Sequence, residues 1–286
     1  FTVETGEGLY VCRLRGRLKR GRASGDIAAL GDRVHITALP DGTGAIDEVL
    51  PRQRAIIRLD PRPQGLYQQV LLANPDQALF VFACAHPEPR LRMLDRFLVV
   101  AEKQKVPAVI VANKVDLVGM ERAREMFGLY RQPGYRVLYT SAADGIGLDE
   151  FRLCLQGKLS ALAGPSGAGK SSLLNAIQPG LGLEVNALSA VDKGQHTTVV
   201  RQLFPLEGHG YVADTPGWKW LALWDIAPEE LDAYFPEIAP LVAHCQFSDC
   251  THTHEPGCAV RLAVEEGRVH PERYESYIRM RHGQEQ

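Results

Sequence analysis

Residues 164–171 carry the pattern that most limits what this chain can be, because they fit G-x-x-x-x-G-K-[ST] at each fixed position. The apolar run 159–163 predicts a short buried strand before them, and 172–177 predicts a helix after them. Glycines in such a loop let successive N–H groups converge on phosphate oxygens at a helix N-terminus. An accidental glycine-rich turn would need neither flanking element, so we expect a phosphate-binding loop.

The residue types in this loop have distinct expected roles. Lys170 supplies a point charge to the β- and γ-phosphates, and the Ser171 hydroxyl binds Mg²⁺. Pro165 has no N–H, so the phosphate cradle must rest mainly on residues 167–171. The nucleotide-binding residues expected here are Gly164, Ser166, Gly167, Ala168, Gly169, Lys170, Ser171 and Ser172.

Composition limits the class of protein. A chain of 286 residues suggests two or three domains, and its 45% hydrophobic content is enough for real cores. The net charge of −2 argues against nonspecific coating of nucleic acid, although a local basic patch would be hidden in that total. No apolar run in the sequence is long enough to span a membrane, and its first residues lack the basic start and apolar core of a signal peptide, so we expect a cytoplasmic protein. The sequence opens at Phe1 rather than Met, and we expect further residues before it.

The first sixty or so residues alternate apolar and polar side chains in short runs, at 9–12, 33–37 and 45–50. Turn signals around Pro40 and Gly42 separate these runs. The pattern predicts a small antiparallel barrel of the OB type over residues 1–65.

A basic run lies between the first two of these strands. Its cationic side chains alternate, so on a strand they would line one face. Such a stripe suits an RNA phosphate backbone, and the alternative is an ordinary solvated strand face. The expected RNA-binding residues are Arg13, Arg15, Arg17, Lys19, Arg20 and Arg22.

From residue 77 the pattern changes to buried strands that alternate with helices. Continuous apolar strands are predicted at 78–83 and 108–112, with helical spacing of apolar residues between them. This arrangement predicts a parallel sheet with crossover helices.

The strand at 108–112 runs directly into Asn113, Lys114, Val115 and Asp116, which form the N-K-x-D guanine-reading tetrad. Asp116 can accept hydrogen bonds from the guanine N1–H and exocyclic amine, a pair that adenine does not offer. Asn113 braces the base and the loop, while the stem of Lys114 covers the face of the base. Alone, the tetrad would also fit a helix start at a strand end, but beside a phosphate loop it predicts GTP.

A further strand at 136–140 ends in Ser141 and Ala142. A backbone N–H at this point is expected to meet the guanine O6.

The motifs occur in rotated order, because the guanine reader precedes the phosphate loop. A parallel sheet tolerates such a rotation when the old termini lie close together. Beyond the loop come G-x-H-T-T at 194–198, a hairpin that pairs 199–204 with 211–213, and D-T-P-G at 214–217. The Mg²⁺ ligands expected here are Thr197 or Thr198 together with Asp214, and Gly217 completes the element that senses the γ-phosphate.

The rotated order, the N-terminal barrel, G-x-H-T-T and D-T-P-G together resemble the circularly permuted GTPases of small-subunit biogenesis, the RsgA or YjeQ family. The resemblance covers essentially the whole chain. It departs at Val199, where the family often has a third threonine. It implies a GTPase domain over residues 70–222 and a helical zinc-binding domain over 223–286.

Three of the six cysteines, Cys12, Cys84 and Cys154, are scattered. The other three, Cys245, Cys250 and Cys258, lie in one short segment, which in a cytosolic protein indicates a metal site rather than disulfides.

With one histidine these three thiols make a Cys₃His set suited to tetrahedral zinc, and the closed set indicates a structural ion. His244 and His254 compete for the histidine position, but the resemblance favours His252. Unrelated surface thiols are the alternative.

The remaining C-terminal pattern is helical. A short helix is predicted at 228–235, and two more at 259–266 and 271–281. Arg273, Arg279 and Arg281 predict a second basic surface.

The position after Gly217 is where many GTPases carry the glutamine that orients the attacking water, and here it is Trp218. An indole cannot polarise that water, and the sequence identifies no arginine finger. His196 is the best local substitute, and the resemblance implies the same role; otherwise it packs or faces solvent. The expected catalytic residues are His196, Lys170 and Asp214.

The architecture predicts GTP hydrolysis coupled to release from an RNA–protein assembly. The resemblance implies that this assembly is the small (30S) ribosomal subunit late in its maturation, and we expect turnover that is slow alone and stimulated by the subunit. The expected cofactors are Mg²⁺ and one structural Zn²⁺, and the chain is expected to act as a monomer. We expect the GTP and GDP states to differ in the angle between two RNA-binding ends, the barrel and the zinc domain. This change of angle would couple hydrolysis to release.

One alternative is a GTP-dependent RNA-binding factor that acts on another RNA–protein assembly. Two further alternatives belong to other classes of protein. A metabolic phosphotransferase or ATPase is disfavoured by the guanine-reading tetrad. A scaffold with a degenerate nucleotide site is disfavoured by the intact Lys170, Ser171 and Asp214.

Overall fold

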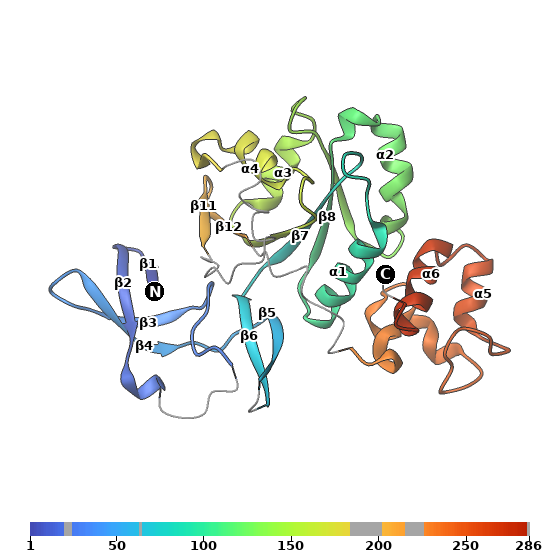
Figure 1. Cartoon of the computed structure of the whole chain (residues 1–286), viewed down its shortest axis with the longest axis horizontal. Helices are drawn as coiled ribbons and strands as arrows, with labels where there is room; N and C mark the ends of the chain where they lie inside the picture. Colours follow the sequence, from blue (N-terminus) through green and yellow to red (C-terminus); the bar gives the residue numbers. More distant parts are fainter. Residues whose placement is uncertain (20–24, 63–64, 184–201, 215–225, 285–286) are drawn as a thin grey trace. The chain divides into compact units, whose positions relative to one another are not determined.

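The computed structural model describes residues 1–19, 25–62, 65–183, 202–214 and 226–284, in two compact units, Phe1–Pro75 and Asp76–Gln286 (Figure 1). The first unit extends to Pro75, beyond residue 70, where the GTPase domain is predicted to begin, and the bounds 1–65 and 70–222 stay predictions. The second contains both the predicted GTPase domain and the predicted C-terminal domain, and the boundary between those two stays a prediction. Within the described residues, every helix is too short or too polar to cross a bilayer.

The first unit contains a four-stranded sheet and a two-stranded hairpin within the described residues. The sheet order is β1 (Thr2–Thr5), β2 (Gly8–Leu14), β4 (Thr43–Val49), β3 (Val34–Ala38), and the hairpin pairs β5 (Ala55–Arg62) with β6 (Gly65–Ala73). The neighbours pair antiparallel except for β2 and β4, which run parallel. The antiparallel pairing expected of the barrel is therefore wrong for that one pair.

The basic run does not continue as a strand. β2 ends at Leu14, and the 3-10 helix η1 (Gly16–Lys19) follows because the Leu18 N–H donates to Arg15 O and closes a turn. The predicted alternation on one strand face is therefore wrong for Arg17 and Lys19. Arg15 forms an ion pair with the Asp47 carboxylate, and Arg17 Nη2 donates to Asp47 O at 2.9 Å. Arg20 and Arg22 lie outside the described residues.

The second unit is organised by a six-stranded sheet in the order β11-β12-β10-β7-β8-β9. Its bounds are β7 (Gln77–Ala83), β8 (Ala108–Asn113), β9 (Arg136–Thr140), β10 (Leu159–Ala163), β11 (Leu203–Leu206) and β12 (Gly210–Asp214). All neighbours are parallel except β11, which pairs antiparallel with β12 in the predicted hairpin. Residues 199–201 of that hairpin lie outside the described part of the chain.

Helices cover the sheet. They are α1 (Leu91–Lys103), α2 (Met120–Phe127), α3 (Leu148–Leu155) and α4 (Lys170–Ile177), with 3-10 turns η2 (Val115–Leu117), η3 (Gly128–Arg131) and η4 (Pro179–Leu181). Phe151 of α3 and Leu173 of α4 pack in one buried cluster with Val81 and Val111 of the sheet. Phe97 of α1 contacts Phe80 and Phe82, with ring centroids 5.4 and 6.0 Å apart.

The C-terminal segment, residues 226–284, contains the 3-10 helices η8 (Pro228–Tyr234) and η9 (Ala239–His244) and the helices α5 (Ala259–Glu265) and α6 (Pro271–Arg281). The two predicted α-helices of this segment are confirmed, whereas the helix predicted at 228–235 is of the 3-10 type. In Figure 1 the red helix α6 lies beside α1.

A buried arginine joins the C-terminal segment to α1. Arg273 is 1% exposed, and its guanidinium binds Asp95 of α1 at 2.7 Å and Glu237 at 2.7 Å. The Ser276 hydroxyl also donates to Asp95, and the Tyr130 hydroxyl does so at 2.9 Å. Burial alone would lower the pKa of Arg273, but the two carboxylates raise it above its usual value. The expected surface position of Arg273 is therefore wrong, since two buried carboxylates hold it inside.

We expect Arg273→Ala to lower the free energy of unfolding by about 3–5 kcal/mol, because it leaves Asp95 buried without its cation. Arg279→Ala is the matched control on the same helix, since Arg279 pairs with Glu275 at the surface and such pairs contribute about 0–1 kcal/mol. Denaturant unfolding of both variants makes the comparison. Equal unfolding midpoints for the two variants would contradict an anchoring role for Arg273.

Candidate functional site

The carboxyl ends of five parallel strands meet at one edge of the sheet. Asn113 ends β8, Thr140 ends β9, and the phosphate loop begins directly after β10. Asp214 ends β12 and pairs in register with Leu162 of β10. The sheet therefore brings the predicted guanine-reading and phosphate-binding segments to the same edge, although they are far apart in the sequence.

The phosphate loop packs tightly against its neighbours. Gly164 has φ +150°, and a Cβ built there would collide with the Val81 carbonyl of β7. Gly169 has φ +93° at the N-cap of α4, and a Cβ there would collide with the Asn113 side-chain amide. Both positions require glycine because the backbone is left-handed or closely approached.

Asn113 connects the guanine-reading segment to the phosphate loop. Its Nδ2 donates to Ala168 O at 2.9 Å, and its Oδ1 accepts from the Thr140 hydroxyl at 3.1 Å. Asn113 is 1% exposed and Thr140 is 0% exposed, so both hydrogen bonds are buried. One amide side chain thus connects strands β8 and β9 and the phosphate loop.

The other loop residues have defined positions. Lys170 is 6% exposed, and its Nζ donates to Gly164 O and Pro165 O, at 2.9 Å in each case. Ser171 is 5% exposed in the first turn of α4. The amine therefore lies against the first two residues of the loop, and its expected contact with the phosphates stays a prediction.

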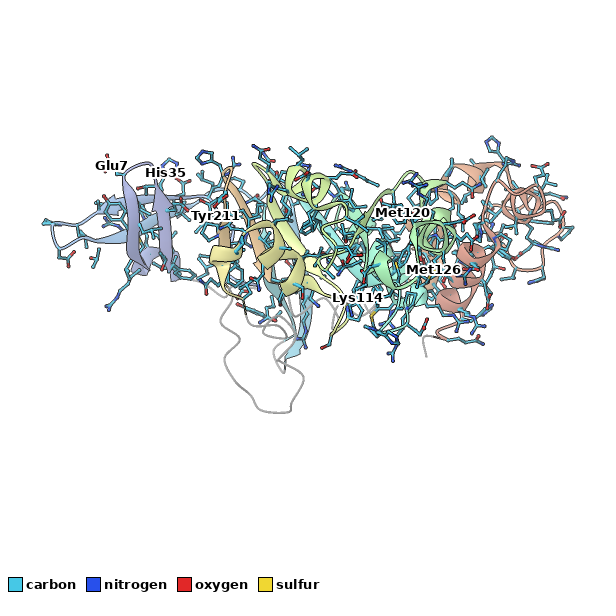
Figure 2. All side chains as sticks on the ribbon, turned by 90° about the horizontal axis from the view of Figure 1, so that it is seen from above. Glu7, His35, Lys114, Met120, Met126 and Tyr211 are labelled. Carbon is cyan, nitrogen blue, oxygen red and sulfur yellow. The ribbon has the colours of Figure 1, made fainter. Side chains whose placement is uncertain are left out.

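The remaining members of the guanine tetrad lie in the turn after β8. Lys114 has φ +63°, and its Nζ donates to His86 O in the segment between β7 and α1. Figure 2 labels Lys114, and Met120 and Met126 of the helix that follows. Asp116 is exposed. Burial, with the Asp116 charge nearby, raises the pKa of Cys84 to about 12, so this neighbour stays a neutral thiol.

Ser141 is engaged within its own loop, since its N–H donates to Ile146 O at 3.0 Å. Its side-chain oxygen accepts from the Asp144 N–H at 3.1 Å.

Several expected site residues lie outside the described part of the chain. They are His196, Thr197, Thr198, Gly217 and Trp218. For Asp214 the structure describes the strand backbone only.

Comparison with known proteins identifies the family. Residues 49–224 match the RsgA GTPase family. The small ribosomal subunit biogenesis GTPase RsgA of Gemmatimonas aurantiaca is 48% identical over 283 residues, which covers 98% of this chain and 91% of that protein. The chain belongs to the RsgA GTPase family. The protein of the same name from Moorella thermoacetica is 44% identical over 279 residues, covering 97% of this chain and 91% of that protein.

Solved structures confirm the fold of this RsgA-family chain. The crystal structure of YjeQ from Thermotoga maritima matches with a TM-score of 0.80 at 38% identity and covers 99% of this chain and 93% of that one. YloQ, described as a circularly permuted GTPase, matches with a TM-score of 0.75 at 31% identity, covering 99% and 89%. The predicted rotation of the GTPase motifs is therefore confirmed. Membership of the family makes this chain a GTPase, with GTP as its nucleotide and Mg²⁺ as its accompanying ion.

The predicted metal ligands of this RsgA-family chain come together in the C-terminal segment. One potential ligand atom from each of Cys245, Cys250, His252 and Cys258 lies within 4.8 Å of the others. His252 is 0% exposed, and its Nδ1 lies 3.5 Å from the Sγ atoms of both Cys245 and Cys258. His252, not His244 or His254, is the histidine of this group.

The chemistry of this cluster fits a cation. Burial and the neighbouring thiols of Cys258 and Cys245 raise the pKa of the Cys250 thiol to about 12. Cys258 lies at the N-cap of α5, where its Sγ accepts from the Arg261 N–H at 3.5 Å. Three converging thiols and one imidazole therefore form a potential metal site.

Sequence reasoning missed two residues of these sites. Thr140 was only the last residue of a predicted strand, and its contact with Asn113 depends on the pairing of β8 with β9. Asp232 lies in η8, and its Oδ2 is 3.4 Å from His252 Nε2. Neither residue carries a local sequence signal, because each partner is distant along the chain.

Thr140→Val should weaken GTP binding by up to about tenfold and destabilise the fold by about 1–3 kcal/mol, because Asn113 Oδ1 loses its buried donor. Thr140→Ser is the matched control, since it keeps the hydroxyl. Equilibrium binding of GTP and denaturant unfolding measure the two effects. The assignment fails if the valine and serine variants bind GTP equally well.

Proposed function

We propose that this chain is a GTPase that acts on the small ribosomal subunit late in its maturation, and that GTP hydrolysis is coupled to its release. The observation that carries the proposal is the convergence of a guanine-reading tetrad and a phosphate loop at one sheet edge in rotated order. It is supported by relatives that match 97% or more of the chain and are named for small-subunit biogenesis.

The guanine end of the site is formed by Asp116, which accepts from the N1–H and exocyclic amine, with Asn113 and Lys114 as its support. Because the Ser141 N–H is engaged with Ile146 O, we assign the contact with the guanine O6 to the N–H of Ala142. Preference for GTP over ATP then comes from hydrogen-bond donors that adenine lacks.

The phosphate end is formed by the backbone N–H groups of 167–171 and the N-terminus of α4. Lys170 exchanges its two carbonyl partners for the β- and γ-phosphates. The Ser171 hydroxyl would hold Mg²⁺, together with Asp214 and either Thr197 or Thr198. The backbone of Gly217 would contact the γ-phosphate, so that this element senses whether GTP or GDP is bound.

His196 is proposed to position the attacking water, since Trp218 cannot accept a hydrogen bond from it. Phosphoryl transfer needs mainly positioning and charge stabilisation, which Lys170 and Mg²⁺ supply. We expect a slow reaction in the free protein and a faster one when the protein is bound to the subunit.

RNA contact is assigned to the basic run of the first unit. Arg13 is exposed on β2, and Arg15 and Arg17 share Asp47, an exchangeable surface interaction. Hydrogen bonding from Thr37 and the two arginines lower the pKa of Asp47, so it stays ionised beside them. Lys19, Arg20 and Arg22 extend the same run. Phosphate contacts of this kind weaken as salt is raised.

The Cys₃His cluster is proposed to hold one structural Zn²⁺. Three thiolates and an imidazole are the ligands that zinc prefers, and a closed set of four leaves no position for substrate. Zinc would supply cohesion to a segment whose elements are short. The chain is proposed to work as a monomer.

The test is phosphate release from GTP and from ATP, with and without purified small subunits, at two salt concentrations. We expect slow turnover alone and strong, GTP-only stimulation that fades with salt. Lys170→Ala is the control for nucleotide-dependent background. Equal rates with and without subunits would refute the ribosomal assignment while leaving the GTPase assignment intact.

His196→Ala should lower subunit-stimulated turnover by about 100-fold while GTP binding is retained, because the water loses its positioning group. Single-turnover phosphate release on the subunit and equilibrium GTP binding separate the two effects. Unchanged stimulated turnover in this variant would rule out the role of His196.

A further inference from the structure

The two ring nitrogens of His252 face different groups. Nδ1 lies 3.5 Å from the Sγ atoms of Cys245 and Cys258. Nε2 lies on the other edge of the ring, 3.4 Å from Oδ2 of Asp232. The imidazole is 0% exposed, so protein groups determine which nitrogen carries the hydrogen.

A neutral imidazole carries one hydrogen, and the nitrogen that binds a metal must be the one without it. The thiols face Nδ1, so the hydrogen belongs on Nε2, where a carboxylate can accept it. We propose that Asp232 is a positioning residue of the metal site, which fixes the tautomer and the ring orientation of His252. This inference rests on the proposed metal binding of the Cys₃His cluster.

Other contacts fix the backbone of His252, but they do not determine which ring nitrogen carries the hydrogen. His252 has φ +61°, and its carbonyl accepts from the Tyr274 hydroxyl at 2.6 Å. Tyr277 holds the preceding residue, since its hydroxyl donates to Thr251 O at 3.2 Å. The ring itself lies against the Tyr277 ring, with centroids 6.0 Å apart, and this contact does not choose between the two nitrogens.

Asp232 is well placed for this role. It lies in η8, far in sequence from the cysteines, and its side chain is 16% exposed. η8 is itself fixed to α1, because Glu230 binds Lys103 at 3.0 Å. Carboxylates that accept from the second nitrogen of a metal-binding histidine orient the ring, and their loss typically costs about 10- to 100-fold in metal affinity.

The test uses the full chain loaded with Co²⁺ or Zn²⁺, with affinity measured by chelator competition. We expect Asp232→Ala to bind metal about 10- to 100-fold more weakly. Asp232→Asn keeps an accepting oxygen without the charge, and we expect a smaller loss. Glu229→Gln is the matched control, an exposed acid of the same 3-10 helix, and should bind as the unsubstituted chain does.

A second measurement reports the ring directly. In the metal-loaded protein, ¹H–¹⁵N correlation of the His252 side chain should show Nε2 protonated and Nδ1 bound to metal. A hydrogen on Nδ1, or metal affinity of Asp232→Ala equal to that of Glu229→Gln, would overturn the role of Asp232. Co²⁺ loading also tests the site itself, since absence of thiolate-to-cobalt absorption in the unsubstituted chain would refute metal binding and, with it, this inference.

Discussion

The nucleotide site depends on the parallel hydrogen bonding of β10 between β7 and β12. This pairing places the phosphate loop in the middle of the sheet edge, and the pairing of β7 with β8 places Asn113 beside it. Because side chains meet through the register of the sheet and not through chain order, the guanine reader can precede the phosphate loop without a change in the site. The Asn113 amide depends on this register, because it forms hydrogen bonds with Ala168 O of the phosphate loop and with Thr140 of β9. Rotation of the chain relocates the termini and leaves this edge intact.

A second constraint acts in the C-terminal segment, where short helices enclose only a small apolar core. Small folded segments of this kind usually need a cross-link, a metal or an unusual packing interaction to hold together. Here α6 takes part in two polar clusters. Arg273 binds Asp95 and Glu237, while Tyr274 and Tyr277 hold the metal-ligand loop through His252 O and Thr251 O. Helix α6 is therefore the element through which the metal-ligand loop and α1 stabilise each other.

The sequence was informative where chemistry depends on local spacing. The phosphate loop, the guanine tetrad, the cysteine cluster and the strands of the parallel sheet follow from residue types a few positions apart. It was less informative where partners are distant. Arg273 looks like a surface cation until Asp95, on another helix, is brought against it. The alternation of the basic run predicts one continuous strand, but a 3-10 helix begins at Gly16. Periodicity cannot show that the pairing of β2 with β4 ends at Leu14. Thr140 and Asp232 act only through contacts made across the fold.

Helix α1 forms ion pairs with the C-terminal segment. At its buried face Asp95 holds Arg273, and at its C-terminal end Lys103 binds Glu230 of η8. Ahead of its first turn, the His86 carbonyl accepts from Lys114, and a Cβ built on Gly167 would lie 3.5 Å from Pro87 Cδ. Separation of α6 from α1 would leave buried charges unpaired, at a cost of several kcal/mol. Helix α1 and the chain ahead of it therefore contact the C-terminal segment, the guanine-reading turn and the phosphate loop.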